Sequence, residues 1–414
     1  MELLEHACRR RPAGAGDAAA FVLSRMPHPD AAAAAAPAFV DAATGAALSF
    51  AALRRAALAL ASGLRLGLGL RRGDAVLVVS PNTLLLPQVV LGVLAAGAVV
   101  ATADPDATAA EIAASARGAG AVVVVAAPEV AAKVAGAGVG VPLLLTSRSP
   151  DPRALSAEEL IDGADPTALA DADVAAEERP RPSDVAFVAC SSASRTVAMT
   201  HADLVAAAVA AGAGSPDEGR VCLASVPMCS PHGLPLVALG LPAAGATSVL
   251  VPPPSDPRAA REVVAAHGAT DVVATPEAAA ALAAPMPLDG KLSTLRRVTV
   301  APPSLAPEAR QEFCRRLPWV ELAELAGMEM EPVSEQVTPA QLGALPRTQP
   351  DAAVTQQNSQ PADQMSETTE TAAPVPALKK IQRIILGDIF SRSTTSKTLR
   401  KHPVTCNRHA VSKL

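Results

Sequence analysis

The residues best suited to bind phosphate lie between Cys190 and His201, in the sequence CSSASRTVAMTH. This stretch follows an apolar run, DVAFVA, and precedes the helix-like ADLVAAAVAAG, an arrangement in which α/β proteins hold phosphate groups. It contains no glycine, although glycine normally lets backbone N–H groups close around phosphate oxygens. Three interpretations therefore stay open: a phosphate loop, a damaged one, or an ordinary turn between a strand and a helix. Hydroxyl and guanidinium groups bind phosphate oxygens, and the candidate residues are Ser191, Ser192, Ala193, Ser194 and Arg195.

A second short signal is the tripeptide Ser412, Lys413 and Leu414 that closes the sequence. A C-terminal Ser-Lys-Leu is an address that the peroxisomal import receptor reads. We therefore expect a peroxisomal protein with that receptor as a partner; without import the protein would be cytoplasmic.

The cysteines and the first residues bear on the compartment. Six cysteines are scattered along the chain, with no CxxC pair and no histidine at zinc-finger spacing. We expect reduced thiols in an intracellular protein, and neither a disulfide framework nor a cysteine metal site. The start, MELLEHACRRRPAG, has no apolar core after its basic residues, which argues against a secretory signal.

Composition excludes two further classes of protein. The 414 residues include 35 Lys and Arg against 40 Asp and Glu, a formal net charge of −5. Nucleic-acid-binding proteins usually carry a basic field, so we expect no nucleic-acid partner. Two long uncharged stretches, 75–103 and 221–255, are broken by Pro and Gly at short intervals. Buried parallel strands with intervening helices have this pattern, so we expect no membrane span.

Elements that would position these residues alternate along the chain. Helix-like segments separate apolar, strand-like segments, and this spacing predicts an α/β fold with parallel sheets flanked by helices. The predicted strands lie in DAVLVVSPN, GAVVATADP, GAVVVVAA, DVAFVA, SVLVPPP, DVVAT and LRRVTVA.

The same alternation gives the domain boundaries. We expect an N-terminal extension at 1–37 and a large domain at 38–332, made of two α/β subdomains with a linker near 149–183 rich in Pro, Asp and Ala. Residues 333–375 are dominated by Gln, Thr, Pro, Ser and acidic side chains, a composition that predicts disorder. Residues 376–414 contain LKKIQRIILGDIF and a basic tail.

Several blocks, in the right order, resemble plant 4-coumarate–CoA ligase and its acyl-CoA-synthetase-like relatives in the adenylate-forming (AMP-binding) superfamily. They are the segment from LSFAALRR to VVATADP at 48–105, SVPMCSPHGLPLVALGLPAAGATSVLVPPP at 225–254 and LSTLRRVTVAPPSLAPEARQEFCRRLP at 292–318. The resemblance implies a large N-terminal domain of parallel sheets flanked by helices, a third β-rich subdomain and a small C-terminal domain. Residues 376–414 would be a remnant of that last domain.

The resemblance also implies a reaction. A carboxylate attacks the α-phosphorus of ATP to give an acyl-AMP and pyrophosphate, and the thiolate of CoA then displaces AMP. The protein would be an ATP-dependent acid–thiol ligase that uses ATP, Mg²⁺ and CoA. Its substrate would be a small-molecule carboxylic acid of the aromatic, fatty or oxylipin type.

Matching the family's nucleotide motifs assigns roles to residues of this chain. CSSASRTVAMTH lies where the family has approximately YSSGTTGxSKGVxLTH, so the GTTG core is gone and Arg195 falls near the usual lysine. Lys397, in LGDIFSRSTTSKTLRK, falls on the catalytic lysine that contacts the carboxylate and the α-phosphate. Glu329 or Glu331 would bind the metal. The implied ATP-binding residues are Ser191, Ser192, Ala193, Ser194, Arg195, Glu324, Glu329 and Lys397.

The acid-binding motifs match less closely. In VPMCSPHGL, Ser230 replaces the family's histidine, and His232 stands where an aromatic residue lines the acyl pocket. In ELAELAGMEM, Ala326 replaces the tyrosine that stacks on adenine, and Met330 replaces the glutamate associated with magnesium. Pro253 stands in place of a CoA-contacting lysine. The implied acyl-adenylate pocket consists of His232, Pro302, Glu324, Leu325, Gly327 and Met328.

The family's β-rich subdomain, with the TGD motif whose aspartate holds the ribose, has no counterpart in this sequence. Its loss removes several nucleotide contacts together, each worth about 1–3 kcal/mol when charged groups are involved. Two hypotheses follow. The ordered blocks favour an acyl-CoA ligase of the 4-coumarate–CoA ligase-like group. The lost motifs favour a catalytically inactive pseudoenzyme or interaction protein, the product of a decayed or mis-spliced gene.

Overall fold

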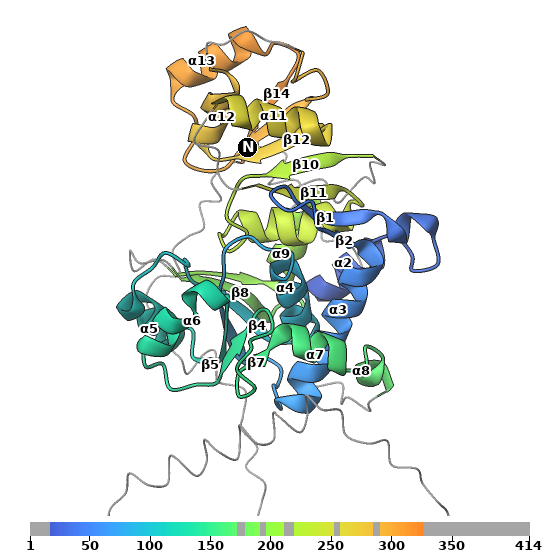
Figure 1. The fold of residues 1–414 in the computed structure, drawn as a ribbon, viewed down its shortest axis with the longest axis vertical. Coiled ribbons are helices and arrows are strands. Elements are labelled where there is room, and N and C mark those ends of the chain that lie inside the picture. The colour runs from blue at the N-terminus through green and yellow to red at the C-terminus, as the bar shows by residue number, and fades with distance from the viewer. Residues whose placement is uncertain are drawn as a thin grey trace, which may run out of the picture.

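Two seven-stranded sheets form the framework of the protein (Figure 1). The computed structural model describes residues 17–171, 179–190, 196–210, 219–251, 257–284 and 290–325. Sheet A contains, in spatial order, β14 (Glu321–Glu324), β13 (Arg297–Val300), β12 (Asp271–Ala274), β10 (Val221–Ala224), β11 (Thr247–Leu250), β1 (Pro37–Asp41) and β2 (Ala47–Ser49). Sheet B contains β7 (Leu155–Ser156), β6 (Leu143–Leu145), β5 (Ala121–Ala126), β3 (Ala75–Val79), β4 (Val99–Thr102), β8 (Val185–Cys190) and β9 (Thr196–Thr200).

Helices cover both sheets and fill the space between them. The outer face of sheet B carries α5 (Ala109–Gly118) and α6 (Pro128–Gly136). The outer face of sheet A carries α11 (Pro257–His267), α12 (Pro276–Leu282) and α13 (Pro307–Arg316). The shared inner core contains α2 (Ala18–Arg25), α3 (Phe50–Ser62), α4 (Leu86–Ala95), α7 (Ala157–Gly163), α9 (His201–Ala208), η5 (Leu234–Gly240) and α10 (Leu241–Ala243). The shorter η1 (Ala32–Ala35), η2 (Gly63–Gly67) and α8 (Ala168–Asp171) complete the described helices.

Alternation along the strands explains this layering. In β3 every residue is buried: Val76 and Val78 belong to the inner core, whereas Leu77 and Val79 belong to the outer one. Complete burial of a Val or Leu side chain stabilises a fold by about 1.5–3 kcal/mol, so strands apolar on both faces require helices on both sides.

Small residues allow the central helices to approach closely. A Cβ added at Gly92 of α4 would lie only 2.8 Å from the Cβ of Leu60 in α3. The alanine-rich composition therefore supports close packing between helices, in compensation for the small area that each alanine buries.

Local signals in the sequence start and end several elements. Thr108 begins α5 with a reciprocal capping box in which its hydroxyl accepts a hydrogen bond from the amide of Glu111, and Ser156 begins α7 in the same way with Glu159. Gly97, at φ +74°, turns the chain from α4 into β4. That backbone conformation is strained for a residue with a Cβ, so a glycine stands there.

The predicted fold class is confirmed, and the two uncharged stretches contain strands and helices of the core. Residues 75–103 contain β3, α4 and β4, and residues 221–255 contain β10, η5, α10 and β11. Among the described residues, none of the helices is long and apolar enough to cross a membrane. The described cysteines, Cys190, Cys222, Cys229 and Cys314, are free thiols.

The structure distributes the chain between the sheets differently from the predicted subdomains. The predicted linker near 149–183 contains β7, α7 and α8, and both β7 and α7 contribute to the inner core. The predicted extension at 1–37 contains α2, whose Ala18, Ala19 and Val22 are buried. Strands β1 and β2 join sheet A across a long sequence separation, with Phe39 opposite Ser248.

Thr200 and His201, the last residues of CSSASRTVAMTH, have structural roles. The hydroxyl of Thr200 accepts a hydrogen bond from the amide of Asp203 and caps α9. His201 is 1% exposed, and its Nδ1 accepts a hydrogen bond of 3.1 Å from the amide of Ala18, which anchors the first turn of α2.

Opposing influences act on this buried imidazole. Desolvation lowers the pKa of His201, while the charges of Asp17 and Asp184 raise it and that of Arg72 lowers it. Burial is the strongest of these influences, so the pKa of His201 lies below its ordinary value. Asp184 itself is bound by the Arg72 guanidinium through two hydrogen bonds of 2.7 Å each.

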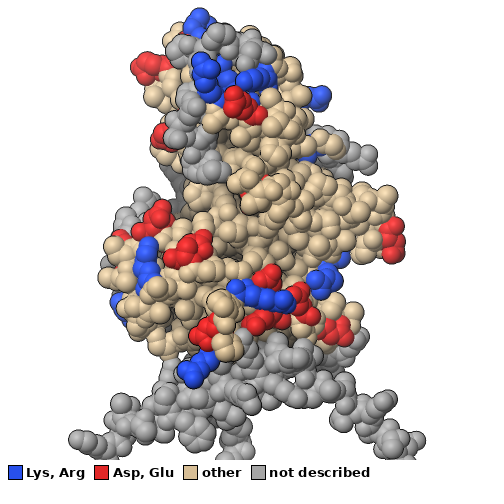
Figure 2. Space-filling model, viewed as in Figure 1, with Lys and Arg blue, Asp and Glu red and all other residues tan. Residues whose placement is uncertain are grey.

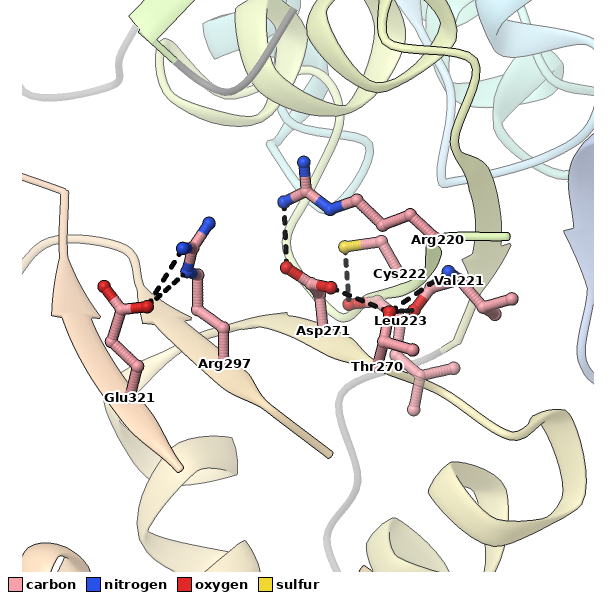
Figure 3. Close-up of polar contacts among 8 residues, drawn as sticks. All are labelled: Arg220, Val221, Cys222, Leu223, Thr270, Asp271, Arg297 and Glu321. Atoms are coloured by element: carbon pink, nitrogen blue, oxygen red, sulfur yellow. Dashed lines mark hydrogen bonds and ion pairs between the residues drawn. The ribbon is translucent and has the colours of Figure 1, made fainter. Parts of the chain in front are cut away.

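Charged residues of alternating sign cross sheet A at the amino ends of its strands (Figure 3). Asp271 lies opposite Arg297, which in turn lies opposite Glu321. Arg220 contacts Asp271 at 2.9 Å with side chains only 10% and 12% exposed, whereas Arg297 and Glu321, at the same distance, are 44% and 61% exposed. The first pair is therefore largely desolvated, so losing one partner would leave a buried charge, whereas the second pair adds little stability.

The surface has no field of one sign in the view of Figure 2. Basic and acidic side chains are interspersed near α11–α13 and again near α7, with broad uncharged surface between them.

Candidate functional site

The carboxyl ends of the two parallel sheets meet at the segment that follows β10, and this junction contains the candidate site. Ligands of open α/β sheets bind outside the carboxyl ends of the strands. Residues 225–233 leave β10 and contact the ends of β3 and β4 from the other sheet. We call residues 226–233 the β10 loop.

Asn82 holds the start of the β10 loop against sheet B. Its Nδ2 donates a hydrogen bond of 2.8 Å to the carbonyl of Val226, and its Oδ1 accepts one of 2.8 Å from the amide of Met228. The hydroxyl of Thr102 donates a further hydrogen bond of 2.7 Å to the carbonyl of Cys229. Sheet B thus determines the path of a loop that belongs to sheet A.

Inside the loop, Pro227 forms a tight turn with the residues that follow. Its carbonyl accepts a hydrogen bond of 3.1 Å from the amide of Ser230. The amide of Gly233 donates 2.9 Å to the Ser230 hydroxyl, and a Cβ at Gly233 would lie only 2.0 Å from the Pro227 oxygen. Only glycine is compatible with this close approach.

His232 is half-buried in the loop, and its Nε2 is buried without a hydrogen-bond partner among the described residues. Desolvation by burial lowers the pKa of His232. The imidazole is therefore uncharged near neutral pH and offers a polar but neutral group to a bound molecule. A neutral imidazole forms no ion pair with a carboxylate, so neutralising the charged end of an acid requires other residues.

Cys229 also points toward sheet B but is chemically inert. Its Sγ lies 3.2 Å from the carbonyl of Ser80, and burial raises its pKa to about 12. A thiol with so high a pKa is not a nucleophile at neutral pH.

The remaining described pocket residues follow β13 and β14. These strands are neighbours, with Val300 opposite Glu324, so the half-buried Pro302 and Leu325 leave the sheet at adjacent positions. The Glu324 carboxylate lies 3.4 Å from the guanidinium of Arg310 on α13, on the outer face of the sheet. This ion pair occupies the only predicted ATP contact that lies within the described residues. The assignment of Glu324 to ATP and to the acid pocket stays a prediction.

The structure changes one interpretation of CSSASRTVAMTH. Strand β9 follows the loop and pairs antiparallel with β8, with Cys190 opposite Thr196. The connection is therefore a β-hairpin, and the idea of an ordinary turn between a strand and a helix is wrong. Burial raises the pKa of the Cys190 thiol, at the end of β8, to about 11.

Many predicted site residues lie outside the described part of the chain. This holds for the whole candidate phosphate loop, for the nucleotide residues after Leu325, and for the peroxisomal tripeptide. Among the described residues, no group of three or more His, Cys, Asp or Glu side chains is placed to hold a metal ion. The residues outside are Ser191, Ser192, Ala193, Ser194, Arg195, Pro253, Ala326, Gly327, Met328, Glu329, Met330, Glu331, Lys397, Ser412, Lys413 and Leu414.

Sequence reasoning missed Asn82. It follows the buried run AVLVVSP, and a polar residue directly after a buried parallel strand is a signal that would have marked it. Its partners, Val226 and Met228, lie 144 and 146 residues later, and no local pattern predicts that contact.

This architecture, with two mainly parallel sheets and a loop held where their carboxyl ends meet, defines an α/β protein with helices on both faces of each sheet. A family model described as AMP-binding enzyme matches residues 28–349, and the chain belongs to that family.

Plant proteins give the curated matches. The chain is 34% identical over 256 residues to 4-coumarate–CoA ligase-like 3 of Oryza sativa subsp. japonica, covering 56% of this chain and 42% of the relative. It is 32% identical over 326 residues to the putative 4-coumarate–CoA ligase-like 8 of the same organism, covering 70% and 50%. Peroxisomal OPC-8:0-CoA ligase 1 of Arabidopsis thaliana is 29% identical over 220 residues, covering 52% and 40%. The chain thus spans about half the length of these relatives.

A solved structure of the same kind has a similar fold. A benzoate CoA ligase from Burkholderia xenovorans superimposes with a TM-score of 0.62 at 25% identity, covering 74% of this chain and 60% of the other. The likeness covers about three quarters of this chain and supports the expected architecture.

Proposed function

We propose that the protein activates a small carboxylic acid with ATP as an acyl-CoA ligase of the 4-coumarate–CoA ligase-like group. The observation that carries the proposal is the β10 loop, whose path is fixed by specific contacts where the carboxyl ends of both sheets meet. A decayed protein has no need to retain two opposed hydrogen bonds from Asn82 and a glycine in contact with the Pro227 carbonyl.

The residues of this loop suit the uncharged part of an acid. Val226 and Met228 pack into the inner core behind the loop, and His232 adds one neutral polar group with a lowered pKa. A neutral, largely apolar loop favours an aromatic, fatty or oxylipin-type chain over a highly charged one. The carboxylate would be met by cationic residues, and we assign that role to Lys397.

In the proposed reaction, a carboxylate oxygen of the acid forms a bond to the α-phosphorus of ATP while the bond to the pyrophosphate leaving group breaks. The CoA thiolate then attacks the carbonyl carbon, and AMP leaves. Arg195 and Lys397 would neutralise phosphate charge, which is the main demand of such chemistry. Glu324 is the only predicted ATP contact within the described residues, and its carboxylate lies 3.4 Å from the Arg310 guanidinium. ATP, Mg²⁺ and CoA would therefore depend on residues outside that part.

Product formation tests the proposal. The purified chain would be incubated with ATP, Mg²⁺, CoA and one acid at a time from a panel of cinnamic, fatty and oxylipin acids, and acyl-CoA would be measured by mass spectrometry. We expect one class of acid to give a thioester, and the Lys397→Ala variant to give none. The absence of thioester with every acid, from folded protein, would refute the ligase.

A second candidate is a non-catalytic binding or interaction protein. The observation that favours it is the glycine-free loop CSSASRTVAMTH. It predicts acid binding, measurable by calorimetry, without any ATP-dependent product. Transcript sequences that join GMEM to an intact TGD block would instead show that the full enzyme has been interrupted by mis-splicing.

We also propose import into peroxisomes through Ser412, Lys413 and Leu414. The tripeptide itself supports this, and one similar plant ligase carries the word peroxisomal in its name. A fluorescent protein fused to the N-terminus should give punctate signal that overlaps a peroxisomal marker. Deleting the tripeptide should make that signal diffuse, and an unchanged pattern would refute the targeting role.

A further inference from the structure

We infer that Asn82 is a positioning residue for acid binding, through which sheet B sets the position of His232 in the β10 loop. This inference rests on the proposed function, because the β10 loop is the segment assigned to the acid. Asn82 does not reach the acid in this account; it acts through the backbone of the loop.

Asn82 brackets a single residue of the loop from both sides. Its amide nitrogen donates to Val226 and its amide oxygen accepts from Met228, each at 2.8 Å, so Pro227 is held between the two contacts. A primary amide supplies a donor and an acceptor at once. Neither alanine nor an aliphatic side chain can replace this pair of bonds, and two partly buried backbone groups would lose their partner.

We call the two hydrogen bonds from Asn82 the clamp. The clamp acts on His232 through backbone contacts of Pro227. The Pro227 carbonyl accepts from Ser230 at 3.1 Å and lies against the α-carbon of Gly233, where a Cβ would be only 2.0 Å away. His232 lies between these two contact residues. A shift of Pro227 therefore has to move the histidine, because no free space separates the carbonyl from Gly233.

The pKa of His232, which NMR can measure, reports how deeply its ring is buried. Its pKa is low because burial desolvates the imidazole. If the clamp is lost, water should reach the ring and the pKa should rise toward the ordinary value of about 6.5. A mutation that only lowers global stability does not change the pKa of a histidine in molecules that are still folded.

The experiment compares the full-length protein with its Asn82→Ala variant by NMR titration of ¹³C-labelled histidines. The His232 signal is assigned by its loss in a His232→Gln variant. The matched control is Thr247→Val, which removes one hydrogen bond of 2.7 Å to the carbonyl of Pro37, far from the loop. We expect the pKa of His232 to rise in Asn82→Ala and to keep its wild-type value in Thr247→Val. An unchanged pKa in folded Asn82→Ala would overturn the inference.

If Asn82→Ala does not fold, Asn82→Ser tests the same point, because a hydroxyl is too short to hold both Val226 and Met228 and leaves a smaller gap than alanine. The expected rise in the pKa of His232 is the same, and an unchanged value again overturns the inference. Neither measurement requires turnover, so a protein without ligase activity still gives a decisive answer about Asn82.

An activity measurement adds a second readout. In acid-dependent ATP–pyrophosphate exchange, loss of the clamp should raise the KM for the acid about tenfold and leave the KM for ATP unchanged, an effect of the size expected for one lost polar contact. A purely structural role would lower the amount of active enzyme without changing either KM, and that result would overturn the inference. Absence of exchange in the wild-type protein would refute the proposed function and not the positioning role.

Discussion

The contact between Gly233 and the Pro227 carbonyl gives a sharp prediction for Gly233→Ala. The new Cβ would lie 2.0 Å from the carbonyl oxygen and 2.9 Å from the Ser230 hydroxyl, whereas real Cβ contacts are essentially never below 3.0 Å. The loop must therefore open by about 1 Å at a carbonyl that is backbone, not a flexible side chain. Such overpacking typically costs 1–3 kcal/mol, and the fixed carbonyl places this case near 3 kcal/mol.

Thermal unfolding followed by circular dichroism measures this cost. For a protein of a few hundred residues each kcal/mol corresponds to roughly 2–4 °C, so the Tm of Gly233→Ala should fall by about 6–12 °C. Gly136→Ala is the matched control, because a Cβ at the end of α6 meets no atom within 4 Å. There alanine should leave the Tm unchanged or raise it slightly, since it lowers the entropy of the unfolded chain by about 0.4–1 kcal/mol.

The difference in Tm between these two variants tests whether Gly233 lies against the Pro227 carbonyl. Equal melting temperatures for Gly233→Ala and Gly136→Ala would show that Gly233 does not lie against the Pro227 carbonyl. The described path of the β10 loop would then be wrong, and with it the route from Asn82 to His232.

Three further predictions test other contacts. Burial lowers the pKa of His201, so below about pH 6.5 the unfolded chain binds more protons than the folded one. The free energy of unfolding should therefore fall with pH until the folded-state pKa is passed, and urea titrations across this window should show the loss. His201→Asn, which keeps an acceptor for the Ala18 amide, should make the free energy of unfolding less dependent on pH. Gly92→Ala should destabilise the protein by about 1–3 kcal/mol, because its Cβ would lie 2.8 Å from Leu60; a wild-type urea midpoint would contradict the close packing. Iodoacetamide at neutral pH should modify exposed Cys314 and spare half-buried Cys229, whose thiol pKa is raised to about 12, as peptide mapping by mass spectrometry would show. Equal modification would refute the desolvation of that thiol.

Much of the fold follows from local sequence patterns. The unit β3–α4–β4 is predictable because apolar runs of strand and helix length are separated by Gly97, whose positive φ ends the helix. Helix α7 was hidden by the composition of the predicted linker, although the sequence SAEE at 156–159 is a readable capping box. The composition of residues 149–183 as a whole thus obscured the capping box that begins this helix.

The misassigned parts depend on contacts between distant segments. Strand β9 has the alternation Thr-Val-Ala-Met-Thr, yet it forms only because the edge of β8 is free to pair with it. The path of β1 into sheet A is decided by pairing with β11, more than 200 residues later. The role of Asn82 is likewise set by partners at residues 226 and 228, and no window of local sequence contains both sides of these contacts.

The two sides of the candidate site differ in how much the sequence and the structure say about them. The acid side was predicted from VPMCSPHGL by its resemblance to a family segment, in which Gly233 is kept and His232 stands in place of an aromatic residue, and the structure shows how this loop is held. On the nucleotide side, the Glu324 carboxylate lies 3.4 Å from the Arg310 guanidinium, and the other predicted residues lie outside the described part. The central question is therefore whether an intact acid loop is joined to a functional nucleotide site.

Carboxylate-dependent exchange of pyrophosphate into ATP answers that question most directly, because it measures the first half-reaction without CoA. We expect exchange that depends on one class of acid and is abolished in Lys397→Ala. Exchange that continues in Lys397→Ala would contradict the role of that lysine. No exchange from folded wild-type protein with any acid of the panel would contradict the ligase and leave an acid-binding descendant of the AMP-binding enzymes.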